Sequence, residues 1–439
     1  MNSAVKVIGA GIAGTEAAWK KKKKNIKVEL FEMKPAKLSP AHVSNNFAEL
    51  VCSNSLRSNE LTNAVGLLKE EMRKLDSLII KTADEAKIPA GGALAVDREH
   101  FSKLITEKIK SHPNITVYNQ EISDIPESNV IIATGPLTSD SLAKKISDIF
   151  PDRNMLSFFD SAAPIVMTDS IDMDYAFFAS RYDRGEPDYI NCPMNKEQYT
   201  KFHENLISAE KATIHGFEEK LVFEGCIPIE VMANRGADTI RYGPLKPVGL
   251  IDPKTGNKPY AVVQLRKDNT DGTLYNVVGF QTHLKFSEQK RVLSMIPALH
   301  RAQIVRYGVM HRNTYIDSPK LLDRYYCLKD NNHISFAGQI TGVEGYVESA
   351  ASGLLCGLET ARKLQSLTPI NFPGKTAIGA LALYISTDSV ANFQPMNINF
   401  GIIDPLEEKI KYKGKRNKNL IISERSLKII DSITEGEWV

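Results

Sequence analysis

The stretch Val5-Lys-Val-Ile-Gly-Ala-Gly-Ile-Ala-Gly-Thr15 predicts the fold of this chain. It has the pattern of a short buried strand, a glycine turn and the start of a helix. The glycines follow G-x-G-x-x-G. The first permits a tight turn, the second lets the backbone approach a pyrophosphate, and the third lets helix and strand pack closely. The turn therefore predicts a dinucleotide site formed by Gly9, Ala10, Gly11, Ile12, Ala13 and Gly14.

A second apolar run, residues 26–31, predicts the next strand of the same unit, and it ends at Glu32. Glu32 follows Gly14 by eighteen positions. An acid about twenty positions after the turn is typical of a ribose-binding carboxylate. Strand, glycines, helix, strand and acid in this order favour a Rossmann-like unit over a glycine-rich turn in some other α/β protein.

Length and composition limit the classes of protein to which this chain can belong. A chain of 439 residues is too long for one ordinary core, so two or three lobes are expected. No apolar run reaches about 18 residues, so no membrane-spanning helix is predicted. The chain begins a core strand almost at once, which leaves no room for a signal peptide and predicts a cytoplasmic protein. The net charge of +3 neither requires nor excludes a nucleic-acid partner.

The five cysteines are scattered, and no pair has C-x-x-C spacing. This pattern favours reduced thiols over a disulfide framework, and it predicts no zinc site.

Later segments return to the predicted dinucleotide site. Residues 130–135 predict a strand that ends in Ala-Thr-Gly, which brings Thr134 and Gly135 to the cofactor, because ligands lie at the carboxyl ends of such strands. Residues 334–353 predict a strand, a loop containing Gly338, Gly342 and Gly345, and a helix of small residues. Two glycine-rich ends favour permanently bound FAD over a nicotinamide cofactor alone.

Between these segments, from about residue 165 to residue 305, frequent turns alternate with strand-like runs such as 261–266 and 274–279. This alternation of turns and strand-like runs predicts a mixed α/β insertion with antiparallel strands. The predicted fold is therefore an α/β, Rossmann-like FAD-binding domain in two parts, residues 1–164 and 306–439, interrupted by an insertion domain of residues 165–305.

Two cysteines lie in patterned segments. Cys52 precedes Ser53, Asn54 and Ser55, which favour a helix N-cap, so its thiolate could be stabilised by a helix dipole. A small buried core residue is the equal alternative. Cys226 lies in Phe223-Glu-Gly-Cys-Ile-Pro-Ile-Glu230, at a predicted strand end or bend. Its pattern alone favours a structural role, although one of the flanking glutamates could handle protons.

Motifs along nearly the whole chain resemble the folate- and FAD-dependent uracil-5-methyltransferases of tRNA, relatives of the GidA-type flavoproteins. The matching segments are Phe47-Ala-Glu-Leu-Val-Cys-Ser-Asn-Ser-Leu-Arg-Ser58, Pro89-Ala-Gly-Gly-Ala-Leu-Ala-Val-Asp97, Phe223-Glu-Gly-Cys226, Tyr307-Gly-Val-Met-His-Arg-Asn313, Ala337-Gly-Gln-Ile-Thr-Gly-Val-Glu-Gly-Tyr346 and Phe393-Gln-Pro-Met-Asn-Ile-Asn-Phe400.

The resemblance implies methylation of a uridine at C5, with FAD as cofactor, 5,10-methylenetetrahydrofolate as one-carbon donor and NADPH or NADH as reductant. It implies that Cys226 attacks C6 of the uracil and that Cys52 guards the flavin intermediate or moves a proton. It also implies that Tyr346 stacks on the isoalloxazine. The cofactor neighbours that it adds are Gly338, Gln339, Glu344 and Gly345.

The implied substrate is RNA, most directly the T-loop uridine of tRNA. Two alternatives stay open, namely the same chemistry on a 23S rRNA uridine and a flavoprotein that binds RNA or folate without methyl transfer. No membrane and no obligate protein partner are indicated. His283 could meet folate or be structural, and the basic stretch of residues 407–420 could line an RNA path or form a solvated helix face.

Overall fold

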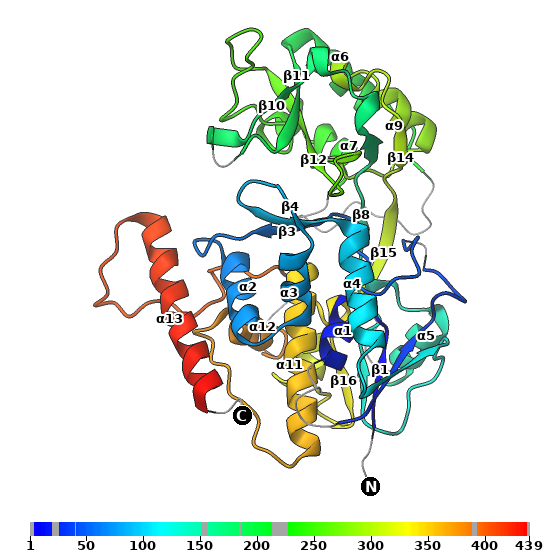
Figure 1. Cartoon of the computed structure of the whole chain (residues 1–439), viewed down its shortest axis with the longest axis vertical. Coiled ribbons are helices and arrows are strands. Elements are labelled where there is room, and N and C mark those ends of the chain that lie inside the picture. Colours follow the sequence, from blue (N-terminus) through cyan, green and yellow to red (C-terminus); the bar gives the residue numbers. More distant parts are fainter. Residues whose placement is uncertain are drawn as a thin grey trace.

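The computed structural model describes residues 4–19, 26–39, 41–150, 156–183, 186–212, 227–388 and 393–436. These residues form two lobes, drawn one above the other in Figure 1. The parallel-sheet lobe holds both ends of the described chain, and the antiparallel-sheet lobe is made from its middle.

The parallel-sheet lobe is built on five strands in the order β16-β7-β1-β2-β6, and every neighbouring pair is parallel. The strands are β1 Val5–Ile8, β2 Val28–Glu32, β6 Ile115–Asn119, β7 Val130–Ile132 and β16 Ile334–Phe336. Apolar, β-branched residues dominate β1 and β7, as expected for strands covered on both faces. The strand order reverses at β1, which is where a doubly wound sheet leaves a crevice for a ligand. The predicted Rossmann-like fold is confirmed.

Two helices from opposite ends of the sequence touch beside this sheet. Helix α1, Ile12–Trp19, packs along α11, Tyr346–Leu364. A Cβ atom on Gly353 would stand 2.2 Å from the carbonyl oxygen of Ala13, and one on Gly357 would stand 2.6 Å from that of Ala17. Only glycine permits this backbone-to-backbone contact, which explains the small residues predicted for the second helix.

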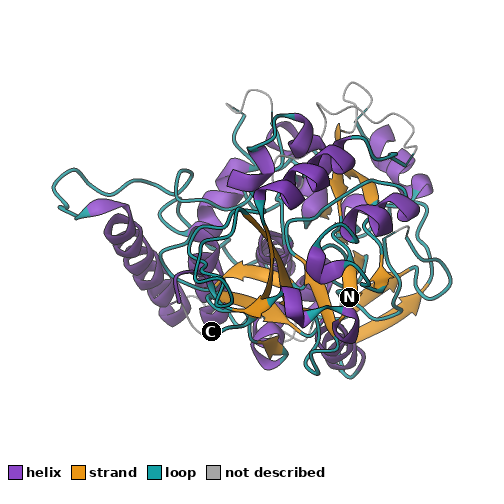
Figure 2. Cartoon of the chain, turned by 90° about the horizontal axis from the view of Figure 1, so that it is seen from above, coloured by secondary structure: helices purple, strands orange, loops and turns teal. Residues whose placement is uncertain are grey.

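The remaining elements of this lobe surround the sheet, as Figures 1 and 2 show. A small antiparallel sheet, β3-β5-β4, faces the other lobe. No helix among the described residues is both long enough and apolar enough to cross a bilayer. The elements are β3 Ser55–Ser58, α2 Ala64–Lys74, α3 Leu78–Glu85, β4 Lys87–Ile88, β5 Ala93–Val96, α4 Arg98–Lys110, α5 Asp140–Asp148, α10 Ser318–Leu321, α12 Ala377–Tyr384 and α13 Gly414–Gly436.

The antiparallel-sheet lobe has six strands in the order β10-β11-β12-β13-β9-β14, with its own hydrophobic core around Phe202, Leu265 and Phe280. All five pairings are antiparallel, so the predicted mixed α/β insertion with antiparallel strands is confirmed. Its elements are β9 Ile165–Met167, β10 Phe177–Phe178, β11 Tyr189–Met194, α6 Lys196–Ile207, α7 Ile229–Asn234, α8 Thr239–Tyr242, β12 Ala261–Lys267, β13 Leu274–Val277, α9 Phe286–Leu293 and β14 Ile304–Arg306.

Two strands and a set of polar contacts connect the lobes. β8, Leu156–Ser161, pairs antiparallel with β15, Met310–Tyr315. Arg98 of α4 bonds through Nη2 to Oδ1 of Asp268 at 2.9 Å, and both side chains are largely buried. The side chain of Asp97 accepts two hydrogen bonds from Thr270, each 2.8 Å long. The lobes therefore meet through charged and polar groups beside the small β3-β5-β4 sheet.

Candidate functional site

A cavity lies at the carboxyl ends of β1, β2 and β7, where the sheet order reverses. Its wall brings together most of the residues predicted to bind the cofactor: Gly9, Ala10, Gly11, Ile12, Ala13, Glu32, Thr134, Gly135, Gly338, Gln339 and Tyr346. Four predicted site residues, namely Gly14, Cys52, Glu344 and Gly345, lie outside this wall. The cavity therefore unites segments from both ends of the sequence.

The three glycines of the first turn have different surroundings. Gly9 has φ +98°, and a Cβ atom there would meet the carbonyl oxygen of Ala133 at 2.6 Å. A Cβ atom on Gly14 would overlap the carbonyl oxygen of Gly9 at 1.8 Å, so Gly14 serves helix–strand packing. A Cβ atom on Gly11 would have no protein atom within 4 Å, because this position faces the cavity. Open space over the second glycine fits a pyrophosphate, so these residues fit a dinucleotide such as FAD.

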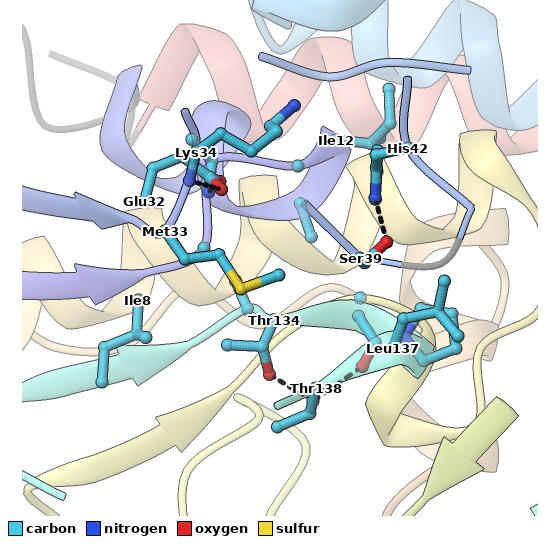
Figure 3. A pocket seen from close by; sticks show the side chains of 18 of the residues that line it. Ile8, Ile12, Glu32, Met33, Lys34, Ser39, His42, Thr134, Leu137 and Thr138 are labelled. Carbon is cyan, nitrogen blue, oxygen red and sulfur yellow. Dashed lines mark hydrogen bonds between the residues drawn. The ribbon is translucent and has the colours of Figure 1, made fainter. Parts of the chain in front are cut away.

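Glu32 closes the turn as well as lining the cavity. Its Oε2 accepts a hydrogen bond from the backbone N–H of Ala10 at 2.8 Å, and its Oε1 accepts one from the N–H of Lys34 at 3.0 Å (Figure 3). A carboxylate has about four lone-pair positions, so two donors leave capacity for a ribose hydroxyl. The backbone contacts hold the carboxylate in place before any ligand binds.

The cavity wall also contains Ser39, His42 and Thr138, which sequence reasoning missed. The hydroxyls of Thr134 and Thr138 lie 2.6 Å apart, and Ser39 Oγ lies 2.5 Å from His42 Nδ1 (Figure 3). Met33 and Leu137 add apolar surface. Ser39 and His42 come from a loop with no periodicity, so no spacing in the sequence could have identified them.

Cys52 is joined to the cavity wall through Tyr346. The tyrosine hydroxyl lies 3.0 Å from Cys52 Sγ, and it accepts a hydrogen bond from the backbone N–H of Cys52 at 2.9 Å. Burial raises the pKa of Tyr346 well above its usual range, so the hydroxyl keeps its proton at neutral pH. Tyr346 lines the cavity itself. The thiol of Cys52, in the segment before β3, is therefore connected to the cavity by the protonated hydroxyl of Tyr346.

The predicted helix N-terminus at Cys52 is wrong. Strand β3 begins at Ser55, and the next helix, α2, begins only at Ala64. The expected N-cap side chains have other partners, because Arg266 of the other lobe donates to Asn54 Oδ1 at 3.0 Å and to Ser53 Oγ at 2.8 Å. Contacts between the lobes therefore override the local capping preference.

Three arginines surround this cysteine and its tyrosine. Arg98 and Arg266 interact electrostatically with Cys52, whereas Arg306 interacts with Tyr346. Burial lowers the pKa of Arg266 and of Arg306, and the charge of Arg98 lowers both further. Arg98 is also paired with Asp268. Sequence reasoning missed these arginines, because they converge only when the lobes meet.

Glu344 and Gly345 shape the loop before α11. Glu344 is buried, and its Oε2 accepts a hydrogen bond from Gln339 Nε2 at 2.6 Å. Gly345 has φ +103° immediately before the helix, a conformation that favours glycine. These two residues fix the loop that presents Gly338, Gln339 and Tyr346 to the cavity.

Cys226 and Glu224 lie outside the described residues, which resume at residue 227. Glu230 and His283, two further candidates, are both buried and face each other, with Glu230 Oε1 2.6 Å from His283 Nδ1. Glu230 also accepts hydrogen bonds from the Thr282 hydroxyl and the His283 N–H. This arrangement favours the structural interpretation of both residues. Within the part of the chain that the structure describes, no cluster of three metal-ligating side chains occurs.

Comparisons with known proteins agree with this geometry. The profile of the family described as "Glucose inhibited division protein A" matches residues 4–368. Two relatives named methylenetetrahydrofolate–tRNA-(uracil-5-)-methyltransferase TrmFO are highly similar. The protein from Acetivibrio thermocellus is 60% identical, with 97% of each chain covered. The protein from Listeria innocua is 58% identical, with 99% of this chain and 100% of its own covered.

A solved structure also matches nearly the whole chain. GidA of Aquifex aeolicus superposes with a TM-score of 0.70 at 16% identity, over 98% of this chain and 73% of that one. At this level of identity the likeness concerns the fold alone.

Proposed function

Since the chain belongs to the GidA family and groups there with the TrmFO methyltransferases, we propose that it methylates C5 of a uridine in tRNA, at the T loop. The product is 5-methyluridine. The one-carbon donor is 5,10-methylenetetrahydrofolate, and NADPH or NADH is the reductant. The observation that carries the proposal is the contact of Cys52 with Tyr346, because it places a thiol against the wall of a dinucleotide cavity.

The cavity residues have separate tasks in this reaction. The open backbone at Gly11 and the carboxylate of Glu32 hold the pyrophosphate and the ribose of FAD. FAD supplies the redox chemistry that carries the one-carbon unit. Tyr346 offers its ring to the cavity and its protonated hydroxyl to Cys52. Cys52 is then placed to hold or move a proton at its sulfur.

We assign the attack on the uracil to Cys226. Uracil C5 is a weak nucleophile until a soft nucleophile saturates the 5,6 double bond. The thiolate of Cys226 adds to C6, and the electron pair of the double bond moves to C5, which forms the new carbon–carbon bond. The carbon that C5 captures is the methylene of the one-carbon unit. A base takes the C5 proton, and the bond from that carbon to the nitrogen that carried it breaks, which leaves an exocyclic methylene group on the ring. A hydride that comes ultimately from NADPH or NADH reduces this group to methyl, and the sulfur of Cys226 leaves as the 5,6 double bond returns. The assignment is supported by the Phe223-Glu-Gly-Cys226 motif.

The substrate and the place of action follow from the same proposal. A uridine must be unstacked before a thiol can reach C6, so a loop suits the reaction better than a duplex. An enzyme that modifies tRNA works in the cytoplasm, and no protein partner is needed for the chemistry. We also propose the division into residues 1–164, 165–305 and 306–439, supported by the separate hydrophobic core of the middle part.

The direct test supplies purified flavin-containing protein with methylenetetrahydrofolate, NADPH and either an unmodified tRNA transcript or 23S rRNA. Formation of 5-methyluridine in the T loop is the expected result, measured by nucleoside mass spectrometry. If only the rRNA gains the methyl group, the tRNA assignment fails. If neither RNA is modified while the protein stays yellow and folded, the enzyme assignment fails.

Variants separate the roles of the two cysteines. Cys226→Ala should abolish methylation and keep the full flavin content. Cys192→Ala is the matched control, because Cys192 is a buried cysteine of β11 in the hydrophobic core of the other lobe. Substantial turnover by Cys226→Ala would exclude this residue as the attacking thiol.

A further inference from the structure

The segment of residues 409–418, Lys-Ile-Lys-Tyr-Lys-Gly-Lys-Arg-Asn-Lys, carries six basic side chains and no acidic one. Six positive charges are twice the net charge of +3 of the whole chain, so the rest of the molecule is net negative. We call this stretch the basic segment. A local concentration of positive charge of this kind attracts a polyanion.

The basic segment is displayed to solvent. It forms the end of the loop that leads into α13 and the first turn of that helix, which projects from the side of the molecule in Figure 2. Lys411, Lys413 and Lys415 are exposed, and none of them has a carboxylate within 4 Å among the described residues. Tyr412 is 46% exposed, with Lys418 Nζ 5.6 Å from the centre of its ring. The cations are therefore available to a partner.

The helix behind the segment holds it in place. Asn419, Ser423 and Ser426 lie on one face of α13 and are buried. They bond to the carbonyl oxygens of Thr62 and Leu61, at 3.0 and 2.7 Å, and to the carboxylate of Glu71. Arg416 lies 3.7 Å from Glu60, in the loop that follows β3. The basic segment is thus fixed beside the strand that continues from Cys52.

Local stability does not explain these charges. Cations in the first turn of a helix oppose its dipole, and α13 has no acidic residue there. A merely solvated helix face would carry both signs, as an ordinary surface does. Lysines next to an exposed tyrosine suit RNA, because phosphates bind the ammonium groups and a base can stack on the ring.

We propose that the basic segment is a docking surface for the phosphate backbone of tRNA, outside the loop that is modified. This proposal rests on the proposed function, because it names the surface that receives the same substrate. The segment holds the body of the RNA while the target uridine enters the site beside Cys52 and Tyr346.

The test uses the full-length, flavin-containing protein. The triple variant Lys411→Gln/Lys413→Gln/Lys415→Gln is compared with Lys144→Gln/Lys196→Gln/Lys201→Gln, which removes three exposed lysines from α5 and α6. Binding of a labelled tRNA transcript is measured by fluorescence anisotropy over a series of KCl concentrations. NADPH oxidation without RNA is measured in parallel.

The first triple variant should bind tRNA about tenfold more weakly near 100 mM KCl, with a salt slope smaller by roughly one for each phosphate that the protein no longer neutralises. The control should bind as the unmodified protein does, and NADPH oxidation should be equal in all three proteins. Equal tRNA affinity and salt slope in both triple variants would overturn the proposal.

Two further outcomes separate the possibilities. If the unmodified protein binds tRNA through these lysines and methylates no RNA, the docking surface stands and the proposed function falls. Anionic vesicles of phosphatidylglycerol are the competing polyanion. Loss of vesicle binding in the first variant with unchanged tRNA affinity would identify a membrane surface and overturn the RNA assignment.

Discussion

Gly11 and Gly14 belong to the same turn, and one residue type serves two purposes there. A Cβ atom on Gly11 would meet no protein atom within 4 Å, whereas one on Gly14 would overlap the carbonyl oxygen of Gly9 at 1.8 Å. We predict that Gly11→Val folds normally and loses FAD, because its side chain fills the pyrophosphate space. Gly14→Val should fail to fold. Flavin absorbance and circular dichroism check both results, and a yellow Gly11→Val protein with full flavin content would refute the placement of the pyrophosphate.

Tyr346 bonds to Cys52 through its hydroxyl, whereas its ring belongs to the cavity wall. We expect Tyr346→Phe to keep its flavin, because the ring remains, and to lower kcat by about a hundredfold if the hydroxyl takes part in proton transfer. Alkylation of Cys52 by iodoacetamide, mapped by mass spectrometry, should also change in rate. Tyr118→Phe, at an exposed ring of β6, is the control. Unchanged kcat and unchanged alkylation would remove Tyr346 from the reaction.

At the scale of elements, Glu71 joins three helices. This buried residue of α2 accepts hydrogen bonds from the N–H groups of Ala377 and Ile378, at 2.7 and 2.8 Å, where α12 begins. It also bonds to the hydroxyl of Ser426 on α13. Burial raises the pKa of Glu71 to about 7, against the effect of these hydrogen bonds. The contact among α2, α12 and α13 therefore depends on the protonation state of Glu71.

The raised pKa of Glu71 determines in which direction the unfolding free energy changes with pH. The folded state binds this proton more tightly than the unfolded state does, so the stabilisation is complete below the unfolded pKa and is lost as the pH rises to about 7. We predict that the unfolding free energy of the unmodified protein falls by about 3 kcal/mol relative to Glu71→Gln between pH 4.5 and pH 7.5. Urea denaturation measures it, with Glu424→Gln on the exposed face of α13 as control. A constant difference across this range would contradict the prediction.

Elements whose own residues carry a period or a turn signal could be predicted from the sequence. The strand expected within residues 130–135 is found as β7, Val130–Ile132, and the strand expected at 261–266 is found as β12. The helix start expected at Cys52 was wrong, because Ser53 and Asn54 have the local pattern of caps and are bound in the structure by Arg266, far along the chain. Local pattern predicts elements well, and it contains no information on partners supplied by another lobe.

The same distinction applies to the cavity. The glycine turn and Glu32 have fixed spacing within one unit and were predicted. Ser39, His42 and the three arginines carry no spacing signal, so only the folded arrangement reveals them.

At the scale of the whole molecule, the contact between lobes rests on Arg98 and Asp268, whose side chains are 12% and 5% exposed. Removing one partner of a buried ion pair leaves the other charge uncompensated. We predict that Asp268→Leu destabilises the protein by about 3–5 kcal/mol, and that Arg98→Met/Asp268→Leu recovers much of this stability. Thermal and urea unfolding measure both variants. A double variant as unstable as the single one would show that the charge of Arg98 is not the cause.

The packing of α1 against α11 also has a consequence for the order of events during protein synthesis. The first helix leaves the ribosome early, whereas its glycine-rich partner, which also presents Tyr346 to the cofactor, is among the later segments. At about 5–20 residues per second, roughly 15 to 70 seconds separate the two. During that interval the antiparallel-sheet lobe can complete its own core. The cofactor cavity still lacks the part of its wall that Gly338, Gln339 and Tyr346 form. Flavin loading is therefore a late event of biogenesis, and a nascent chain cut short before residue 346 would be colourless however well its first lobe had begun to fold.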